Sequence, residues 1–173
     1  KKANFILISI FNNLKFNTYL DLHKWSIENK SDFWRKVWKF TKIKGDLRGE
    51  IYLHNKEFIK CKFFEDCKIN FTENCLSKDD DSDAIIFYSE KNLRKSFSWK
   101  QLREKVFKFS YFLKLNDIGK FDRIAAVLPN IPETVVSFLS TSQIGAIWSS
   151  CSSDFGEKAI IDRFKQIEPK VLI

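Results

Sequence analysis

The chain has 173 residues, enough for one domain of ordinary size or for a piece of a larger protein. Apolar residues make up 44% of it and include 18 phenylalanines, so a sizeable core can form. The net charge is +8, but there is no basic stripe interleaved with aromatics and no zinc-finger spacing, which argues against nucleic-acid binding. The excess charge fits either a solvated lysine-rich surface or the attraction of an anionic small molecule.

Both ends of the chain favour a fragment of a longer protein. The first residue is Lys1 rather than methionine, and the run Val171-Leu172-Ile173 ends the chain within an expected strand. Residues 3–11 are mostly apolar after two lysines, as in a secretory leader, but no small-residue cleavage site follows. The run is too short to span a bilayer, so a core strand or helix is predicted there. No other segment is apolar enough to cross a membrane.

The common catalytic and metal-binding motifs are missing from the sequence. The cysteines at 61, 67, 75 and 151 give no C-x2-C pair, so free buried thiols in a reducing, cytoplasmic compartment are expected. His23 and His54 have no spacing typical of a catalytic triad or a metal site. There is no G-x-x-x-x-G-K-S/T phosphate loop and no G-x-G-x-x-G. The run 154–156 spells the kinase magnesium motif Asp-Phe-Gly, but the glycine-rich and catalytic loops of kinases do not precede it.

The first region, residues 1–80, is predicted to be helical and then irregular. Ser31 is expected to cap a helix with a broad aromatic face made by Phe33, Trp34, Val37, Trp38 and Phe40. Beyond Gly45 the aromatics are irregularly spaced. The acidic run 78–83 lacks the glycine and closing glutamate of a calcium loop, so it is predicted to be a solvated linker.

The second region, residues 82–173, alternates strands and helices. The expected elements, in order, are a strand at 84–88, a strand at 96–99 that pairs back on it across a turn at 91–92, a helix capped by Ser98 and Gln101, a strand at 123–128, a helix opened by Asn130 and Glu133, a strand at 146–149, a helix at 157–167 and a strand at 170–173. The apolar positions of the three helices are 102, 106, 109 and 113, then 135, 136, 139 and 144, then 160, 164 and 167. The fold class is therefore α/β, with a strand-helix-strand-helix-strand unit of a mainly parallel sheet.

The most distinctive segment is the run of small residues at 145–156, which surrounds Trp148, expected to be exposed. Short side chains at a turn between a strand and a helix allow a ligand to approach the backbone. Ligands of parallel sheets bind at the carboxyl ends of strands, and residues 150–156 would occupy that place after the strand at 146–149. A plain turn, with Asp154 and Gly156 at the start of the next helix, is the alternative.

Several segments, taken together, resemble one family. Residues 19–27 with Asp32-Phe33-Trp34, then 63–64 and 69–76, are similar to the opening of acetoacetyl-CoA synthetases. Residues 97–102, 122–125 and 128–133 resemble elements of the wider adenylate-forming superfamily. Residues 144–156, 162–164 and 166–173 are close to the acetoacetyl branch, although Ser153 stands where most of that family has proline and Asp66-Cys67 replaces a pair of small residues. The resemblance covers roughly residues 19–173.

The resemblance implies a two-step ligase, of which this chain would be the N-terminal part. ATP and acetoacetate would give an acyl-adenylate and pyrophosphate, with Mg2+ offsetting phosphate charge, and coenzyme A would then displace AMP. Residues 1–80 would be the N-terminal extension and residues 82–173 the start of the AMP-binding domain. Ser153, Asp154 and Phe155 would lie near the pantetheine arm of coenzyme A. The family's phosphate loop, nucleotide-binding residues and C-terminal lysine find no match here, so no catalytic residue and no metal ligand is assigned and the chain alone is expected to be inactive.

Two alternatives to this function stay open. The first is a ligase for another short acid such as acetate or propionate. The second is a non-catalytic domain that binds a partner or a nucleotide through its basic region. The carboxylate pocket that would separate the acids is not expected among these residues.

Overall fold

The computed structural model describes residues 14, 16, 18–91 and 94–173, which divide into two compact units at Ile69/Asn70. The segment 3–11 and the tip of the turn at residue 92 lie outside the described residues. The domain boundary expected from the acidic linker, between residues 80 and 82, stays a prediction. Residues 77–83 are exposed, but Asp83 already belongs to a strand, so the irregular segment ends at residue 82.

The first unit contains two helices and short paired strands. Helix α2 (Tyr19–Glu28) starts at a capping box in which the Thr18 hydroxyl and the Asp21 carboxylate each accept the other residue's backbone N–H. Helix α3 (Lys30–Phe40) follows almost directly. The remaining elements are β1 (Gly45–Asp46) paired with β4 (Lys68–Ile69), β2 (Tyr52–Leu53) paired with β3 (Lys62–Phe63), and the 3-10 turn η1 (Phe58–Lys60).

The predicted cap of α3 is wrong, and its aromatic face is only partly buried. Ser31 lies inside the helix, because the carbonyl of Asn29 already accepts the Phe33 N–H at 2.9 Å. Among the apolar side chains of α3 only Trp38 is buried, against Phe64 with ring centroids 5.2 Å apart. Leu22 and the fully buried Ile51 are the other buried apolar side chains among the described residues of this unit.

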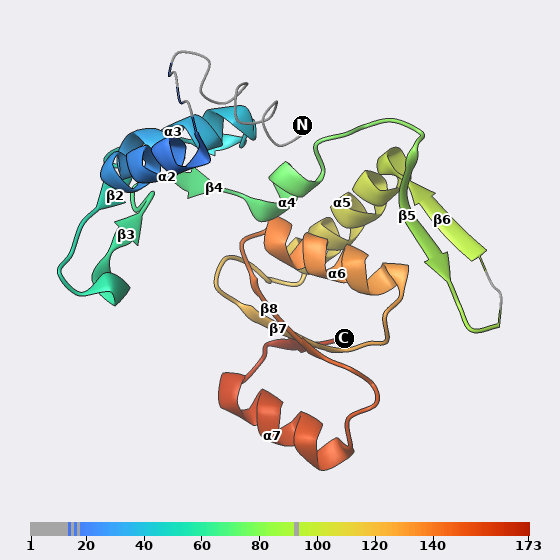
Figure 1. The fold of residues 1–173 in the computed structure, drawn as a ribbon. Helices are drawn as coiled ribbons and strands as arrows, with labels where there is room; N and C mark the ends of the chain where they lie inside the picture. Colours follow the sequence, from blue (N-terminus) through green and yellow to red (C-terminus); the bar gives the residue numbers. More distant parts are fainter. Residues whose placement is uncertain (1–13, 15, 17, 92–93) are drawn as a thin grey trace. The chain divides into compact units, whose positions relative to one another are not determined.

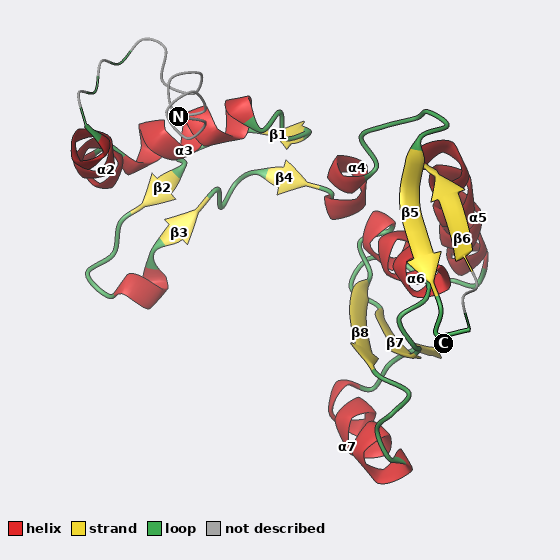
Figure 2. Ribbon diagram, turned by 45° about the vertical axis from the view of Figure 1, so that its right-hand side comes forward, coloured by secondary structure: helices red, strands yellow, loops and turns green. Residues whose placement is uncertain are grey.

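From residue 83 onward, the second unit has the predicted order of strands and helices (Figures 1 and 2). The short helix before them was not predicted. Its elements are α4 (Phe71–Cys75), β5 (Asp83–Tyr88), β6 (Arg94–Ser98), α5 (Trp99–Leu115), β7 (Arg123–Val127), α6 (Pro132–Gln143), β8 (Ile147–Cys151), α7 (Glu157–Ile167) and β9 (Val171–Leu172). Strands β5 and β6 form the expected antiparallel hairpin. The capping box of α5 is confirmed, since Ser98 and Gln101 each accept the other's backbone N–H, at 3.2 and 3.0 Å.

Several predicted boundaries in this unit are wrong; Trp99, for example, is the first residue of α5 and not part of the hairpin strand. Asn130 does not cap α6; Pro132 occupies the first helical position and restricts Ile131 to an extended conformation, so Ile131 is the cap residue. Strand β8 runs to Cys151 instead of residue 149, because Ser150 and Cys151 continue the parallel register with Ala126 and Val127. The loop after this strand therefore begins at Ser152.

The parallel sheet has the order β8-β7-β9, which confirms the α/β architecture. On one face the fully buried Ile124 packs in a cluster with Leu113 and Ile118, next to α5. On the other face Ala125 packs with Cys151 and with Phe164 of α7. The sheet is thus covered on both sides, with α6 and α7 on opposite faces (Figures 1 and 2).

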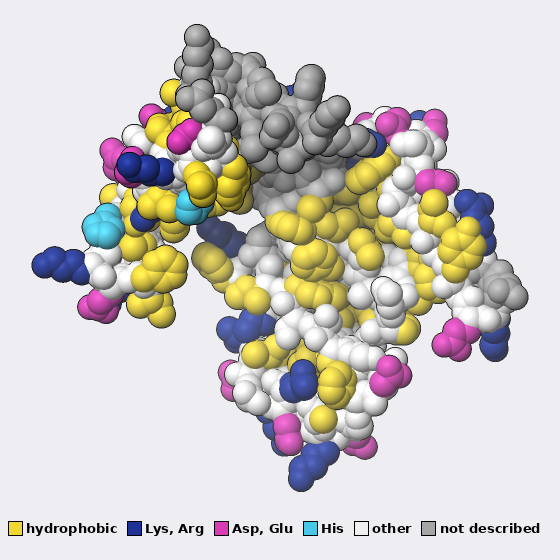
Figure 3. All heavy atoms as spheres, viewed as in Figure 1, with side chains coloured by type: hydrophobic (Ala, Val, Ile, Leu, Met, Phe, Trp, Pro, Cys, Tyr) yellow, Lys and Arg dark blue, Asp and Glu magenta, His cyan; other side chains and the backbone are white. Residues whose placement is uncertain are grey.

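Apolar side chains also remain on the surface of the second unit. Phe107, Tyr111 and Leu115 recur at helical spacing on α5 and are 55–66% exposed. Apolar groups are visible on much of the face shown in Figure 3. Within the described residues no helix has the length and apolar character needed to cross a membrane.

Candidate functional site

The topology brings two loops to one edge of the parallel sheet. Residues 128–131 follow β7 and residues 152–156 follow β8, and the two strands are parallel neighbours. Their chains leave toward opposite faces, because the first loop leads to α6 and the second to α7 (Figure 1). Such a point, where neighbouring crossovers diverge, is where parallel sheets bind ligands. The predicted placement at a carboxyl edge therefore holds for residues 152–156.

The run of small residues at 145–156 has three different parts. Gly145 lies in the turn after α6 and has φ +75°, a conformation that favours glycine. A Cβ atom there would also lie 3.2 Å from the Lys120 Cγ. Residues 147–151 form β8. Trp148 is half-buried rather than exposed; its ring lies edge-on to Phe138 at 6.1 Å and its Nε1 donates to the Ser150 hydroxyl. Only residues 152–156 are left as a candidate ligand-binding loop.

This loop is held by its own hydrogen bonds. The Ser152 hydroxyl donates to Asp154 Oδ2 at 2.9 Å and accepts the Asp154 N–H at 3.3 Å. Helix α7 has Gly156 as its cap residue, as the plain-turn alternative expects, but no side chain caps it, so a capping role for Asp154 is wrong. The Asp154 carboxylate instead stabilises the turn at Ser152. The loop is thereby shaped before any ligand arrives.

The three residues expected near coenzyme A lie together on this loop and are exposed. The Phe155 ring, 41% exposed, lies under the Arg163 guanidinium at 4.5 Å, which anchors it to α7. The free Ser153 side chain offers a hydroxyl that can donate and accept hydrogen bonds. A hydroxyl beside a flat apolar ring suits a neutral amide chain, whereas the Asp154 carboxylate would repel a phosphate.

The described residues do not form a metal centre. Nowhere in the described part of the chain do three or more His, Cys, Asp or Glu side chains gather as a cation would require. His23 stacks on Tyr19, and His54 contacts the Tyr52 hydroxyl, so both have other contacts. All four cysteines are free, as predicted, but only Cys151 is buried.

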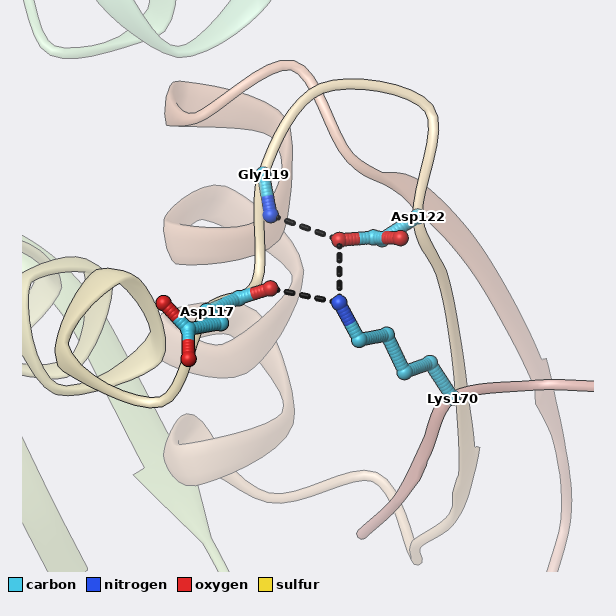
Figure 4. A network of polar contacts seen from close by, with 4 residues as sticks. All are labelled: Asp117, Gly119, Asp122 and Lys170. Atoms are coloured by element: carbon cyan, nitrogen blue, oxygen red, sulfur yellow. Dashed lines mark hydrogen bonds and ion pairs between the residues drawn. The ribbon is translucent and has the colours of Figure 1, made fainter.

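A polar network joins two of the segments that carry the family resemblance. The Asp122 carboxylate accepts the Gly119 N–H at 2.8 Å and pairs with the Lys170 ammonium at 3.1 Å, while Lys170 also donates to the Asp117 carbonyl (Figure 4). The Gly119 N–H and then Lys170 lower the pKa of the Asp122 carboxyl. The network fixes the start of β7 beside the start of β9, so these residues have a structural role.

Asn70 has a comparable role that the sequence analysis did not assign. Its side-chain oxygen accepts the Glu73 N–H at 3.0 Å and caps α4, while its Nδ2 donates to the carbonyls of Ser142 and Gln143 at 3.2 and 3.1 Å. The fully buried Thr72 adds a hydrogen bond from its hydroxyl to the Leu139 carbonyl at 2.7 Å. Only the short cap of α4 could be read from the local sequence; the contacts with α6 span about seventy residues.

Comparison with known proteins agrees with this structural picture. The family model described as AMP-binding enzyme matches residues 71–173. The chain belongs to the AMP-binding enzyme family. Within the family it is a homologue of acetoacetyl-CoA synthetases: it is 39% identical to the acetoacetyl-coenzyme A synthetase of Rhizobium meliloti over 158 residues, which cover 91% of this chain and 24% of that protein. It is 34% identical to the acetoacetyl-CoA synthetase of Gallus gallus, over 92% of this chain and 24% of that protein.

Solved structures of family members show the same fold. The acetoacetyl-CoA synthetase of Streptomyces lividans superposes with a TM-score of 0.83 at 28% identity, covering 91% of this chain and 25% of that one. An acyl-CoA synthetase of Brucella canis gives 0.56 at 28% identity, over 60% of this chain and 20% of that one. The chain thus spans about a quarter of the length of its family relatives.

Proposed function

We propose that this chain is the N-terminal part of an ATP-dependent acetoacetate–CoA ligase. The similarity to acetoacetyl-CoA synthetases over 91% of the chain carries the proposal, because it extends well beyond residues 71–173, which the family shares more widely. In the first step the acetoacetate carboxylate attacks the α-phosphorus of ATP and pyrophosphate leaves. In the second, the thiol of coenzyme A attacks the acyl carbon and AMP leaves, giving acetoacetyl-CoA.

In this proposal the described residues have a structural role and make one contact with coenzyme A. The sequence has no phosphate loop, and the described side chains do not gather as ligands for Mg2+, so no step involving the nucleotide or the metal is assigned to them. The second unit supplies a parallel sheet covered on both faces. Its exposed apolar side chains are available to pack against further parts of the enzyme. The free cysteines agree with the cytoplasmic location we propose.

Ser153, Asp154 and Phe155 are proposed to contact the pantetheine arm of coenzyme A. Support comes from their exposure at the carboxyl edge of the sheet and from the ring of Phe155, fixed under Arg163. In the longer enzyme, Phe155→Ala should raise the KM for coenzyme A about threefold to tenfold, since an aromatic contact contributes about 1 kcal/mol. Pyrophosphate release measured without coenzyme A should not change. Ile161→Ala, which truncates an apolar side chain of similar exposure on α7, is the matched control. An unchanged KM in the Phe155 variant, or an equal rise in both variants, would remove the loop from the coenzyme site.

The function is tested by pyrophosphate release from the protein extended beyond residue 173 along its reading frame. With ATP, Mg2+ and coenzyme A, acetoacetate should be the preferred acid over acetate and propionate, and the 173-residue chain alone should release no pyrophosphate. Preference for acetate or propionate would instead establish the first alternative, a ligase for another short acid. A reading frame that stops near residue 173, with nucleotide or partner binding by this chain, would establish the non-catalytic alternative.

A further inference from the structure

The aromatic ring of Phe155 interacts with a charged side chain of the helix that follows its loop. The Arg163 guanidinium carbon lies over this ring, 4.5 Å from its centre. Phe155 is 41% exposed, and among the described residues it does not belong to the neighbouring apolar cluster of Ala125, Cys151 and Phe164. Arg163 is therefore placed to restrict the orientation of a ring that the core does not hold.

The geometry of α7 brings Arg163 to this loop. Gly156 is the cap residue of the helix, and Arg163 follows seven residues later, which is about two helical turns. Residues seven positions apart lie on one face of a helix, and helical side chains point back toward the N-terminal end. The long side chain of Arg163 therefore extends toward the loop that precedes the helix.

The guanidinium of Arg163 is not committed to an acidic group. Within the part of the chain that the structure describes, it makes neither an ion pair nor a hydrogen bond. The acidic residue of the loop, Asp154, instead accepts a hydrogen bond from the Ser152 hydroxyl at 2.9 Å. A planar guanidinium can stack on an aromatic face, which an ammonium group cannot do. The ring of Phe155 is thus the partner that suits this side chain.

We propose that Arg163 is a positioning residue for coenzyme A, which acts by holding the Phe155 ring in the orientation that the pantetheine arm contacts. This inference rests on the proposed function of the loop. A side chain whose orientation is already restricted loses less conformational freedom when a ligand binds, so the ligand binds more tightly. A guanidinium can also bind phosphate directly, but that role would affect only thiol substrates that carry phosphate groups.

The test compares Arg163→Gln with Lys165→Gln in the longer enzyme. Both substitutions remove one positive charge from an exposed position of α7, so the second is the matched control. Arg163→Gln should raise the KM for coenzyme A about twofold to fivefold, the effect of one exposed cation–π contact. The kcat, and pyrophosphate release measured without coenzyme A, should not change. Arg163→Lys should raise the KM less, since an ammonium can lie over the ring although it cannot stack on it.

Pantetheine as the thiol substrate separates the positioning role from a phosphate contact. This thiol has the same arm as coenzyme A but carries no phosphate group. If Arg163 acts by holding the ring, Arg163→Gln should lower kcat/KM for pantetheine by the same factor as for coenzyme A. A loss confined to coenzyme A would overturn the proposal, because Arg163 would then act on the phosphates.

The double variant Phe155→Ala/Arg163→Gln shows whether Arg163 acts through the ring. Its KM for coenzyme A should be no higher than that of Phe155→Ala alone, and multiplied effects would overturn the proposal. An unchanged KM in Arg163→Gln, beside a raised KM in Phe155→Ala, would overturn it too and would leave the coenzyme contact of the loop in place. An unchanged KM in Phe155→Ala would instead remove both the loop and Arg163 from the coenzyme site. Circular dichroism reports whether each variant folds.

Discussion

The junction between α4 and α6 gives a sharp test of how Asn70 acts. The Asn70 side chain makes two kinds of hydrogen bond there. Its oxygen caps α4, and its amide nitrogen donates to the carbonyls of Ser142 and Gln143 at the end of α6. Asn70→Ser keeps an oxygen for the cap but removes both donors. Asn70→Asp also keeps the cap, and it places a carboxylate oxygen against those carbonyls.

The expected changes in the free energy of unfolding follow from these two kinds of hydrogen bond. Because water can reach this partly exposed site, loss of the two donated bonds in Asn70→Ser should cost about 1 kcal/mol. The carboxylate of Asn70→Asp faces the negative end of the α6 dipole, so its total cost should be about 2 kcal/mol. This added penalty should disappear as the pH falls and the carboxyl becomes protonated, since a protonated carboxyl can donate to a carbonyl again.

The assay is urea denaturation followed by circular dichroism, with amide hydrogen exchange of β7 residues 124–126 as a reporter of the second unit alone. The reporter is needed because two compact units can unfold separately, and a single transition would then mix them. If the Asn70→Ser chain were as stable as the unmodified chain, the donated bonds to α6 would not contribute as the structure indicates, and the cap alone would explain the residue. Equal stability of the Asn70→Asp and Asn70→Ser chains at neutral pH would contradict the repulsion between the carboxylate and the carbonyls.

Two further predictions concern the second unit. Ser98→Ala should destabilise α5 by about 1 kcal/mol, and the effect should shrink in a Gln101→Ala background, because the two residues form one reciprocal cap. Urea unfolding of the two single variants and the double variant measures this coupling. Strictly additive effects would argue against a shared cap. The pKa of the Asp122 carboxyl is lowered in the folded state, so its stabilisation is present above the unfolded-state pKa and is lost as the pH falls through the folded-state pKa. Asp122→Asn should therefore flatten the acid side of the stability–pH curve, measured by thermal unfolding. An unchanged curve would contradict the stabilisation of this carboxylate by the Gly119 N–H and by Lys170.

Local signals in the sequence predicted much of the second unit. The capping box at Ser98, the helix at 157–167 and the strand-helix alternation all depend on residues within a few positions of one another, and all are confirmed. Local signals failed where another constraint competed. The proline at 132 overrode the capping preference of Asn130, and the register with β7 extended β8 to Cys151. The cap predicted at Ser31 is wrong because the helix has already begun before this residue.

For the candidate site, too, some features could be predicted from the sequence and others depended on the fold. The sequence by itself determined the family, the parallel α/β class and the position of residues 152–156 after a strand, because composition, periodicity and motif order are properties of the chain alone. Only the tertiary structure decided that Trp148 packs on Phe138, that Asp154 stabilises its own loop rather than α7, and that Lys170 and Asp122 meet. It also brought Lys30, Tyr52 and Cys61 together. Such contacts join segments distant in sequence, and side-chain chemistry depends on the partners that folding brings within hydrogen-bonding distance.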